Sequence, residues 1–225
     1  MKKLAKLKRL AAPKWWPIKR KTKKFTVSPR GPHPKNLSLP LLILIRDVFK
    51  FAETGKESKS IIKKGEILVD NRKVKDPKFG VGVFDVIEIP AVKKAWRAIP
   101  KNGLSFIEIP EKEKKLKICK IVDKKTLKGN KIQLNMNDGR NILTNEKYST
   151  QDSLLIELPE QKIIKHIKFE KGSIAMVLGG KNAGIIAKIK EIEKNRVWLG
   201  EEKTFEVPKK LLIVVGKDKN VIKLE

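Results

Sequence analysis

The stretch "SIIKKGEILVDNRKV" (Ser60–Val74) predicts the end of a helix followed by a β-hairpin. The isoleucines at positions 61 and 62 are the buried positions of the helix, and Gly65 suits the left-handed residue that commonly follows a helix C-terminus. The next residues indicate a strand, a tight turn and a second strand. Asp70 and Asn71 form the turn, because Asn tolerates the left-handed backbone that such a turn requires. The stretch therefore predicts a small unit of helix and sheet.

A second helix is expected just upstream, in "SLPLLILIRDVFKFAETG" (Ser38–Gly55). Its apolar residues recur at helical spacing. Ser38 suits the N-cap, Pro40 the first turn and Gly55 the end. "FDVIEIP" (Phe84–Pro90) predicts a further strand that closes the unit.

The start of the later helix, "KESKS" (Lys56–Ser60), differs by one letter from the KMSKS loop that handles ATP in one class of aminoacyl-tRNA synthetases. Only 55 residues precede it, which leaves no room for a nucleotide-binding domain. Lys56, Lys59 and Lys63 instead share one helix face, where like charges repel each other. We interpret this face as a contact for phosphate groups; a solvated surface is the alternative.

Charge is the strongest signal in the composition. The 225 residues contain 53 Lys and Arg against 25 Asp and Glu, a formal net charge of +28. The first 37 residues contain thirteen of these cations and no acid. Such a field attracts polyanions, and acid-free arms are usually ordered only on a nucleic acid. The low aromatic content, 6%, predicts several small cores.

The basic arm contains five prolines, so we expect a short helix at Lys3–Leu10 followed by extended chain. Trp15 and Trp16 lie among its charges. They either anchor the arm on the protein body or stack on a base or sugar. His33, between two prolines, indicates a fixed loop without catalytic function.

From residue 96 onward the alternation of apolar and polar residues predicts β-structure almost throughout. An Asp-Gly pair in "MNDGR" (Met136–Arg140) predicts a hairpin. Five short strands are expected at the end, and together they fit a small SH3-like barrel. They are Ile174–Leu178, Ile185–Ile192, Arg196–Leu199, Thr204–Val207 and Leu211–Val215.

Several functional classes are disfavoured by the residues. The glycines of "LGGKNAG" (Leu178–Gly184) are followed by a strand, whereas a P-loop is followed by a helix. No nucleophile constellation or paired carboxylates are evident, and His166 is isolated, which disfavours a metal site. The single Cys119 fits a small buried side chain. The longest apolar run, Leu39–Ile45, is far shorter than the roughly 18 residues of a membrane span, so we expect a soluble cytoplasmic protein.

Three stretches together carry a resemblance to a known family: "LKRLAAPKWWPIKRKTKKFTVSPRGPHP" (Leu7–Pro34), "SLPLLILIRDVFKFA" and "FGVGVFDVIEIP". They resemble the archaeal and eukaryotic small-subunit ribosomal protein family S-four-e, in its shorter archaeal form. The resemblance runs in order along nearly the whole chain. In the S-four domain pattern the turn before Asp85 usually has a Gly, but here it has Phe84, so we expect a different backbone there.

The resemblance implies an α+β multi-module fold. A basic N-terminal extension (1–37) precedes an S-four-type RNA-binding domain of two helices on a small sheet (38–92). A central β domain (93–170) follows. The last module (171–225) is similar to a KOW domain, an SH3-like β-barrel with a C-terminal strand, and Gly184 matches the characteristic glycine of that motif.

The predicted function is that of a structural, non-catalytic protein of the small ribosomal subunit, acting in the cytoplasm without a cofactor, a small-molecule substrate or a membrane. The expected partners are small-subunit ribosomal RNA and neighbouring ribosomal proteins. Arginines are favoured as phosphate contacts because they bind in a bidentate manner. The predicted RNA-binding residues are Arg9, Lys14, Trp15, Lys19, Arg20, Lys21, Arg30, Lys35, Arg46, Lys56, Lys59, Lys63, Arg72, Lys73, Lys75, Lys181 and Asn182.

Two alternatives remain open at this point. One is a KOW-bearing transcription or translation factor that visits RNA transiently. The other is an RNA-modifying enzyme with an S-four domain, such as a pseudouridine synthase, which needs a larger catalytic domain after residue 92.

Overall fold

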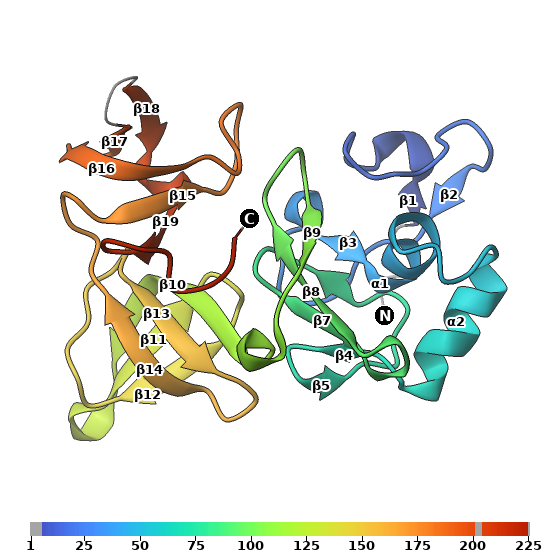
Figure 1. Ribbon diagram of the computed structural model, residues 1–225, viewed down its shortest axis with the longest axis horizontal. Coiled ribbons are helices and arrows are strands. Elements are labelled where there is room, and N and C mark those ends of the chain that lie inside the picture. The colour runs from blue at the N-terminus through green and yellow to red at the C-terminus, as the bar shows by residue number, and fades with distance from the viewer. Residues whose placement is uncertain (1–5, 201–203, 225) are drawn as a thin grey trace.

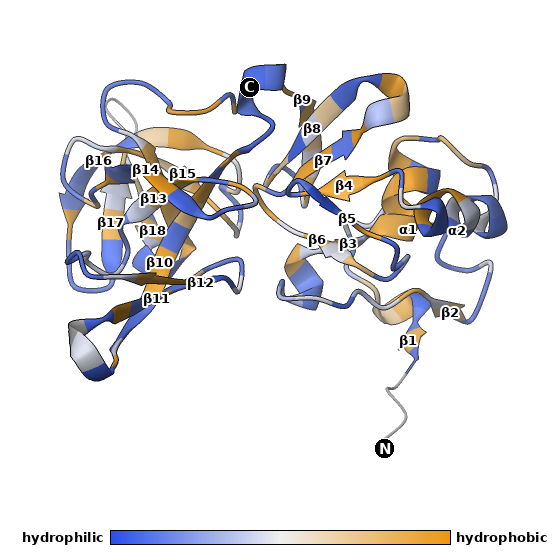
Figure 2. Cartoon of the chain, turned by 90° about the horizontal axis from the view of Figure 1, so that it is seen from below, coloured by the Kyte–Doolittle hydropathy of each residue, from blue (hydrophilic) through white to orange (hydrophobic). Residues whose placement is uncertain are grey.

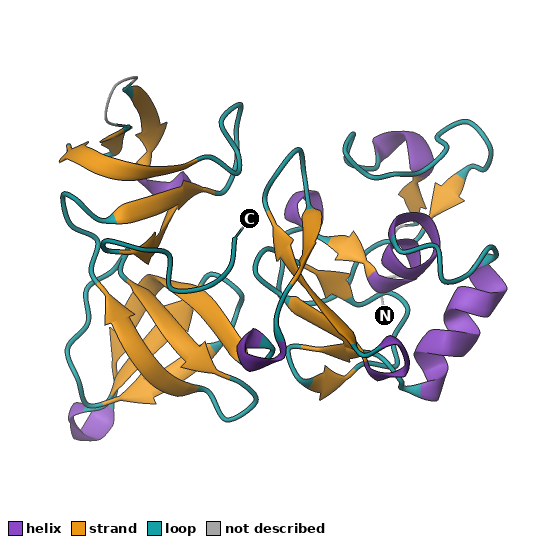
Figure 3. Ribbon diagram, in the orientation of Figure 1, coloured by secondary structure: helices purple, strands orange, loops and turns teal. Residues whose placement is uncertain are grey.

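The computed structural model describes residues 6–200 and 204–224. The chain forms two halves (Figure 1). One half contains the N-terminal residues, helices α1 and α2 and strands β3 to β9. The other contains strands β10 to β19. Helix α2 lies at the outer edge of the first half (Figure 3).

Two helices follow one another in the first half. The first comprises α1 (Leu41–Ile43) and, without a break, the π-helical turn η3 (Leu44–Val48). Residues 41–45 are all buried. The predicted helix is therefore present but shorter: it starts after Pro40, because β3 (Leu39–Pro40) is extended and paired with β6 (Gly80–Val81), and it ends before Gly55.

Gly55 begins the second helix, α2 (Gly55–Lys64), instead of ending the first. Thr54 and Glu57 form a capping box: the Glu57 backbone N–H donates to Thr54 Oγ1 at 3.2 Å, and the Thr54 N–H donates to Glu57 Oε2 at 3.4 Å. At the other end Gly65 has a φ of 76°, which confirms the predicted left-handed residue after the helix.

A five-stranded sheet packs with these helices, in the order β5-β4-β7-β8-β9. Its strands are β4 (Leu68–Val69), β5 (Arg72–Lys73), β7 (Val86–Ile89), β8 (Lys94–Ile99) and β9 (Ser105–Glu108). The turn between β4 and β5 is the predicted one, since Asp70 and Asn71 have φ values of 51° and 63°. The sheet continues past residue 92 through β8 and β9.

The turn at Phe84 has an unusual backbone for a residue with a side chain. Phe84 has a φ of 65°, in the left-handed region that favours Gly. The ring is fully buried. Burial of an aromatic side chain offsets the strain of a left-handed non-glycine residue.

The N-terminal segment, as we call residues 6–37, packs on the first half. Leu7–Lys8 (β1) pairs with Phe25–Thr26 (β2), and Arg9–Ala11 (η1) forms a short 3-10 turn. The helix predicted for Lys3–Leu10 is therefore wrong over its described part, because cross-strand pairing holds residues 7 and 8 extended; residues 3–5 lie outside the described residues. A second 3-10 turn, η2, covers Lys35–Leu37.

The segment is attached to the body by backbone hydrogen bonds as well as by packing. The Arg30 N–H donates to the Lys78 carbonyl, and the Gly80 N–H donates to the Arg30 carbonyl, both at 2.7 Å. Trp16 is buried in the core that also contains α1. The described part of the basic arm is therefore packed against the rest of the protein, whereas the sequence predicted extended chain.

The second half consists of two antiparallel sheets, as the alternation predicted. The central sheet has the order β12-β11-β10-β13-β14 and the C-terminal sheet β18-β17-β16-β15-β19. The strands of the central sheet are β10 (Leu116–Thr126), β11 (Ile132–Met136), β12 (Asn141–Thr144), β13 (Ser153–Glu157) and β14 (Lys162–Ile167). The strands of the C-terminal sheet are β15 (Ile174–Val177), β16 (Ile186–Ile192), β17 (Arg196–Leu199), β18 (Phe205–Pro208) and β19 (Leu212–Gly216).

Hydrophobic residues are concentrated in α1 and the strands of both halves, whereas the loops are mostly hydrophilic (Figure 2). Several small cores result, as the low aromatic content predicted. One of them joins the halves, because Phe84 and Ile99 of the first half pack with Ile118 and Ile213 of the second. The last residues return to this core, where Ile222 is buried. No helix in residues 6–200 and 204–224 combines the length and apolar character needed to cross a membrane.

Candidate nucleic-acid interface

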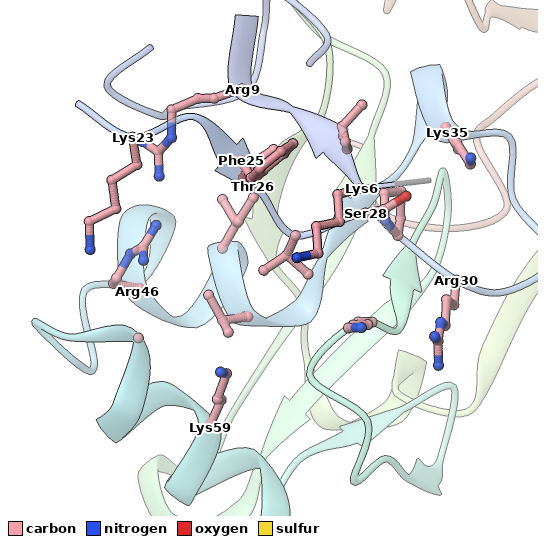
Figure 4. Close-up of a pocket in the computed structure, with 17 residues that line it drawn as sticks. Lys6, Arg9, Lys23, Phe25, Thr26, Ser28, Arg30, Lys35, Arg46 and Lys59 are labelled. Carbon is pink, nitrogen blue, oxygen red and sulfur yellow. The ribbon is translucent and has the colours of Figure 1, made fainter. Parts of the chain in front are cut away.

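A hollow of about 570 Å³ opens between the N-terminal segment and the helices (Figure 4). Residues of β1 and β2 form one wall, and residues of α1, η3 and α2 form the other. Among the described residues that line it none is acidic, whereas eight are cationic. We call it the cationic hollow, and its cations are Lys6, Arg9, Lys23, Arg30, Lys35, Arg46, Lys59 and Lys78.

Five of the residues predicted to contact RNA meet in this hollow, although they come from distant parts of the sequence. They are Arg9, Arg30, Lys35, Arg46 and Lys59. Lys56 and Lys63 are exposed on α2 beside it but do not line it. No pattern in the sequence pointed to Lys6, Lys23 and Lys78 beyond their charge, because their convergence depends on how the N-terminal segment folds back.

Several of these cations are free to bind an anion. Arg30, Lys35 and Lys59 form no ion pair within the described ranges. Arg46, by contrast, donates two hydrogen bonds to the carboxylate of its neighbour Asp47, from Nε to Oδ1 at 3.0 Å and from Nη2 to Oδ2 at 2.7 Å. The Asp47 carboxylate therefore reduces the charge that Arg46 offers to a ligand.

Arg20 has an intramolecular function. Its guanidinium donates to three backbone carbonyl groups at 2.6–3.3 Å. They belong to Leu10, Ala12 and Pro13. These bonds close the loop that follows η1, so at least part of Arg20 serves the fold of the segment.

Arg9 is also committed to the fold of the segment. It is buried, and its Nη1 donates to the Lys19 carbonyl at 2.5 Å and to Thr22 Oγ1 at 3.2 Å. Its charge still reaches the hollow. That Arg9 and Arg20 contact RNA stays a prediction.

The two tryptophans anchor the segment. Trp16 is only 3% exposed and donates from Nε1 to the Ser38 carbonyl at 3.2 Å, so it has no face for a base. Trp15 is half-buried, and its Nε1 donates to the Asn36 carbonyl at 3.0 Å. Its ring lies so close to Gly103 that a Cβ atom there would be 2.5 Å away. Lys14, just before the two tryptophans, is exposed, as are Lys19 and Lys21 between the tryptophans and β2.

The remaining predicted residues lie away from the hollow. Arg72, Lys73 and Lys75 are exposed at the β4–β5 hairpin. Lys181 is exposed and Asn182 half-buried in the loop between β15 and β16. Gly184 of this loop has a φ of 87°, and a Cβ atom on it would lie 2.6 Å from the Pro100 carbonyl oxygen. The glycine therefore permits close contact with the loop after β8.

A second group of charges is buried where the two halves meet. We call it the charge cluster: His33, Asp70, Asp85, Lys117, Asp138 and Arg140. Lys117 Nζ lies 2.6 Å from Asp70, 2.5 Å from Asp85 and 3.2 Å from Asp138. Arg140 pairs with Asp70 at 2.5 Å and with Asp138 at 2.8 Å. His33 Nε2 lies 3.1 Å from Asp85.

Burial and pairing compete in this cluster. Burial lowers the pKa of Lys117, but the carboxylates of Asp70, Asp85 and Asp138 outweigh it and raise that pKa well above its usual value. Burial raises the pKa of Asp85, but Lys117 and His33 outweigh it and hold the pKa below its usual range. At Asp70 burial prevails, and the pKa is raised.

The cluster explains residues that the sequence singled out for other reasons. Asp70 is both the predicted turn residue and a partner of Lys117, and His33 is held by Asp85 in the predicted fixed loop. Cys119 is buried as expected, and burial raises the pKa of its thiol well above the usual value. His166 bonds to Asp152 at 2.7 Å. Among the described residues no group of His, Cys, Asp and Glu has a geometry that could hold a metal ion.

Four family models match successive segments of the chain. Family models described as "RS4NT (NUC023) domain", "S4 domain", "Ribosomal family S4e" and "KOW motif" match residues 3–36, 49–87, 93–163 and 171–199. The residues that line the cationic hollow fall within the first two matches, apart from Leu42, Ile43 and Arg46 in the segment between them. The match at residues 171–199 includes the glycine loop with Lys181.

Individual relatives resemble nearly the whole chain. The small ribosomal subunit protein eS4 of Methanothermobacter thermautotrophicus is 42% identical over 229 residues, 97% of this chain and 95% of the relative. The protein of the same name from Ignicoccus hospitalis is 43% identical over 242 residues, 97% and 94% of the two chains. The crystal structure of the 30S ribosomal protein S4e from Thermoplasma acidophilum matches with a TM-score of 0.72 and 29% identity, covering 81% of this chain and 97% of that one. The resemblance carried by the sequence motifs is thereby confirmed, and the chain belongs to the ribosomal family S4e.

Proposed function

We propose that this protein is a structural, non-catalytic component of the small ribosomal subunit that binds ribosomal RNA. The observation that carries the proposal is the cationic hollow, where the lining residues that the structure describes include eight cations and no acid. Closely spaced phosphates are the ligands that such a surface favours, because binding releases their condensed counterions. Such a protein works in the cytoplasm as part of the ribosome, next to other ribosomal proteins.

Three contact regions follow from the placement of the predicted residues. The cationic hollow and the adjacent lysines of α2 form the first. The exposed hairpin cations Arg72, Lys73 and Lys75 form the second, and the loop of Lys181 and Asn182 the third. The helix pair on its sheet acts in this proposal as an S-four-type RNA-binding domain, and the C-terminal sheet as an SH3-like KOW unit. Module boundaries at residues 37, 92 and 170 belong to the proposal as well.

The experiment compares two double variants with equal loss of charge. Arg30→Gln with Lys59→Gln, the hollow variant, removes two unpaired cations from the hollow. Lys162→Gln with Lys165→Gln removes two exposed cations from β14. We expect the hollow variant to bind transcribed small-subunit ribosomal RNA about tenfold more weakly. The slope of its log affinity against log salt should be smaller by about one to two, since each lost phosphate contact contributes roughly 0.7 to 0.9.

Equal effects of the two double variants would show that net charge, and not the hollow, determines binding. A second measurement tests the place of assembly. On a sucrose gradient the protein should be found in stoichiometric amount in the small subunit and should resist a salt wash. Recovery in the free fraction after a mild wash would favour a transient RNA-binding factor instead.

A further inference from the structure

An aromatic ring gives the cationic hollow a second chemical character. Phe25 lies in its wall between Lys23 and Lys6 (Figure 4), and its side chain is 41% exposed. The Nζ atoms of Lys6 and Lys24 each lie 5.6 Å from the ring centroid. Apolar residues also line the hollow: the half-buried Leu7 and Val27, and the buried Leu42 and Ile43. The site thus combines an aromatic face and apolar lining with a cationic rim.

Two hydroxyl groups add polar positions to the same wall. Thr26 and Ser28 line the hollow next to Phe25, and both are half-buried. Their side chains form no hydrogen bond within the part of the chain that the structure describes. A hydroxyl can donate and accept, so these groups are available to the polar edge of a ligand.

These features exceed what a sugar-phosphate backbone requires. Cations on an open surface suffice to bind phosphates, and an aromatic ring contributes nothing to that. A nucleobase has a flat face that stacks on aromatic rings and an edge that forms hydrogen bonds. The volume of about 570 Å³ also lies within the roughly 300–1,000 Å³ that is usual for sites of small ligands.

We propose that the cationic hollow receives one nucleotide turned out of the RNA. Its base stacks on Phe25, and its flanking phosphates contact the surrounding Lys and Arg side chains. Thr26 and Ser28 then face the base edge or the ribose. This inference rests on the proposed RNA-binding function and adds a specific ligand class to it, a single unstacked ribonucleotide.

The test distinguishes the contribution of the base to RNA binding from that of the sugar-phosphate backbone. The full chain is titrated with a fluorescent single-stranded RNA decamer of mixed sequence and with an abasic decamer of the same length and charge. Phe25→Ala should weaken binding of the ordinary decamer about tenfold, as removal of a stacking aromatic side chain does. Its binding of the abasic decamer should not change. Phe25→Trp should restore the affinity for the ordinary decamer.

Phe51→Ala is the matched control, because Phe51 is an aromatic residue with the same 41% exposure outside the hollow. It should change neither affinity. The hollow variant should weaken the binding of both decamers. Suppose that the hollow variant weakens the binding of both decamers, but Phe25→Ala leaves both affinities unchanged or lowers both equally. The nucleotide site is then refuted, whereas the hollow is retained as an RNA-binding site. If the hollow variant has no effect on either decamer, the proposed RNA-binding site itself is refuted.

Discussion

The charge cluster and the cationic hollow use the same residue types for opposite purposes. In the cluster, Lys117 is 1% exposed and lies within 3.2 Å of three carboxylates. In the hollow, Lys59 is exposed, and no carboxylate lines the site. The first lysine holds two halves of the protein together, whereas the second is available to an external anion. A net charge of +28 therefore says which ligand the protein attracts, but not which cations bind it.

Removing the ammonium of Lys117 should have the largest effect. Lys117→Met leaves three buried carboxylates whose charged partners, among the described residues, are then Arg140 and His33. Breaking a buried ion pair from one side typically destabilises a protein by about 3–5 kcal/mol. We expect a loss of that size in the free energy of unfolding, measured by urea titration at pH 7.

Lys59→Met is the control for that experiment. It removes the same charge from an exposed position, where substitutions usually change stability by no more than about 0.5 kcal/mol. Equal stability of the two variants would mean that the cluster is not a structural contact between the halves, and the contrast between the two sites would fail.

Sequence patterns located the parts of the fold that depend on local chemistry. Gly65 and the Asp70-Asn71 turn were predictable because their backbone requirements are satisfied within a few residues. The capping box of Thr54 and Glu57 was missed, although the spacing Thr-x-x-Glu carries that signal. The left-handed backbone of Phe84 depends on burial of its ring, which no local pattern reports.

Neither charged site could be assembled from the sequence. Asp70 and Lys117 are 47 positions apart, and no periodicity relates them. Lys117 belongs to an alternating strand in which a buried charge breaks the apolar pattern. The hollow likewise needs the N-terminal segment to fold back onto α1, and five prolines suggested extended chain there. Long-range packing decides which cations are buried and which remain available.

A second buried lysine extends the comparison, because its ionisation should make the stability of the protein depend on pH. Lys120, on the same strand as Lys117, is 3% exposed and donates to the carbonyl groups of Lys209 and Lys210 at 3.2 and 3.1 Å. No carboxylate of the described part of the chain offsets its burial, which lowers its pKa to about 8; Lys209 contributes to the shift. Thus two buried lysines differ in pKa because only one has acidic partners.

The sign of the pH effect follows from that shift. Between pH 8 and the usual value of 10.5, the unfolded chain binds the Lys120 proton and the folded chain has released it. Stability therefore rises with pH in this window. Relative to Lys120→Met, the free energy of unfolding should rise on the order of 3 kcal/mol from about pH 8 to about pH 10.5. A constant difference between the two proteins would show that Lys120 is solvated.

The smallest effect on stability is expected at α2. Lys56, Lys59 and Lys63 are exposed and unpaired within the described residues, and they repel one another along the helix. Replacing all three by Ala should leave the unfolding free energy unchanged or raise it by a few tenths of a kcal/mol, partly because Ala is the better helix former. The part that arises from repulsion should disappear in 1 M salt, where charges are screened beyond about 3 Å. A loss of stability as large as that of Lys117→Met, at either salt concentration, would show that these lysines pack against the protein as Lys117 does. There would then be no reason to regard them as available to phosphate.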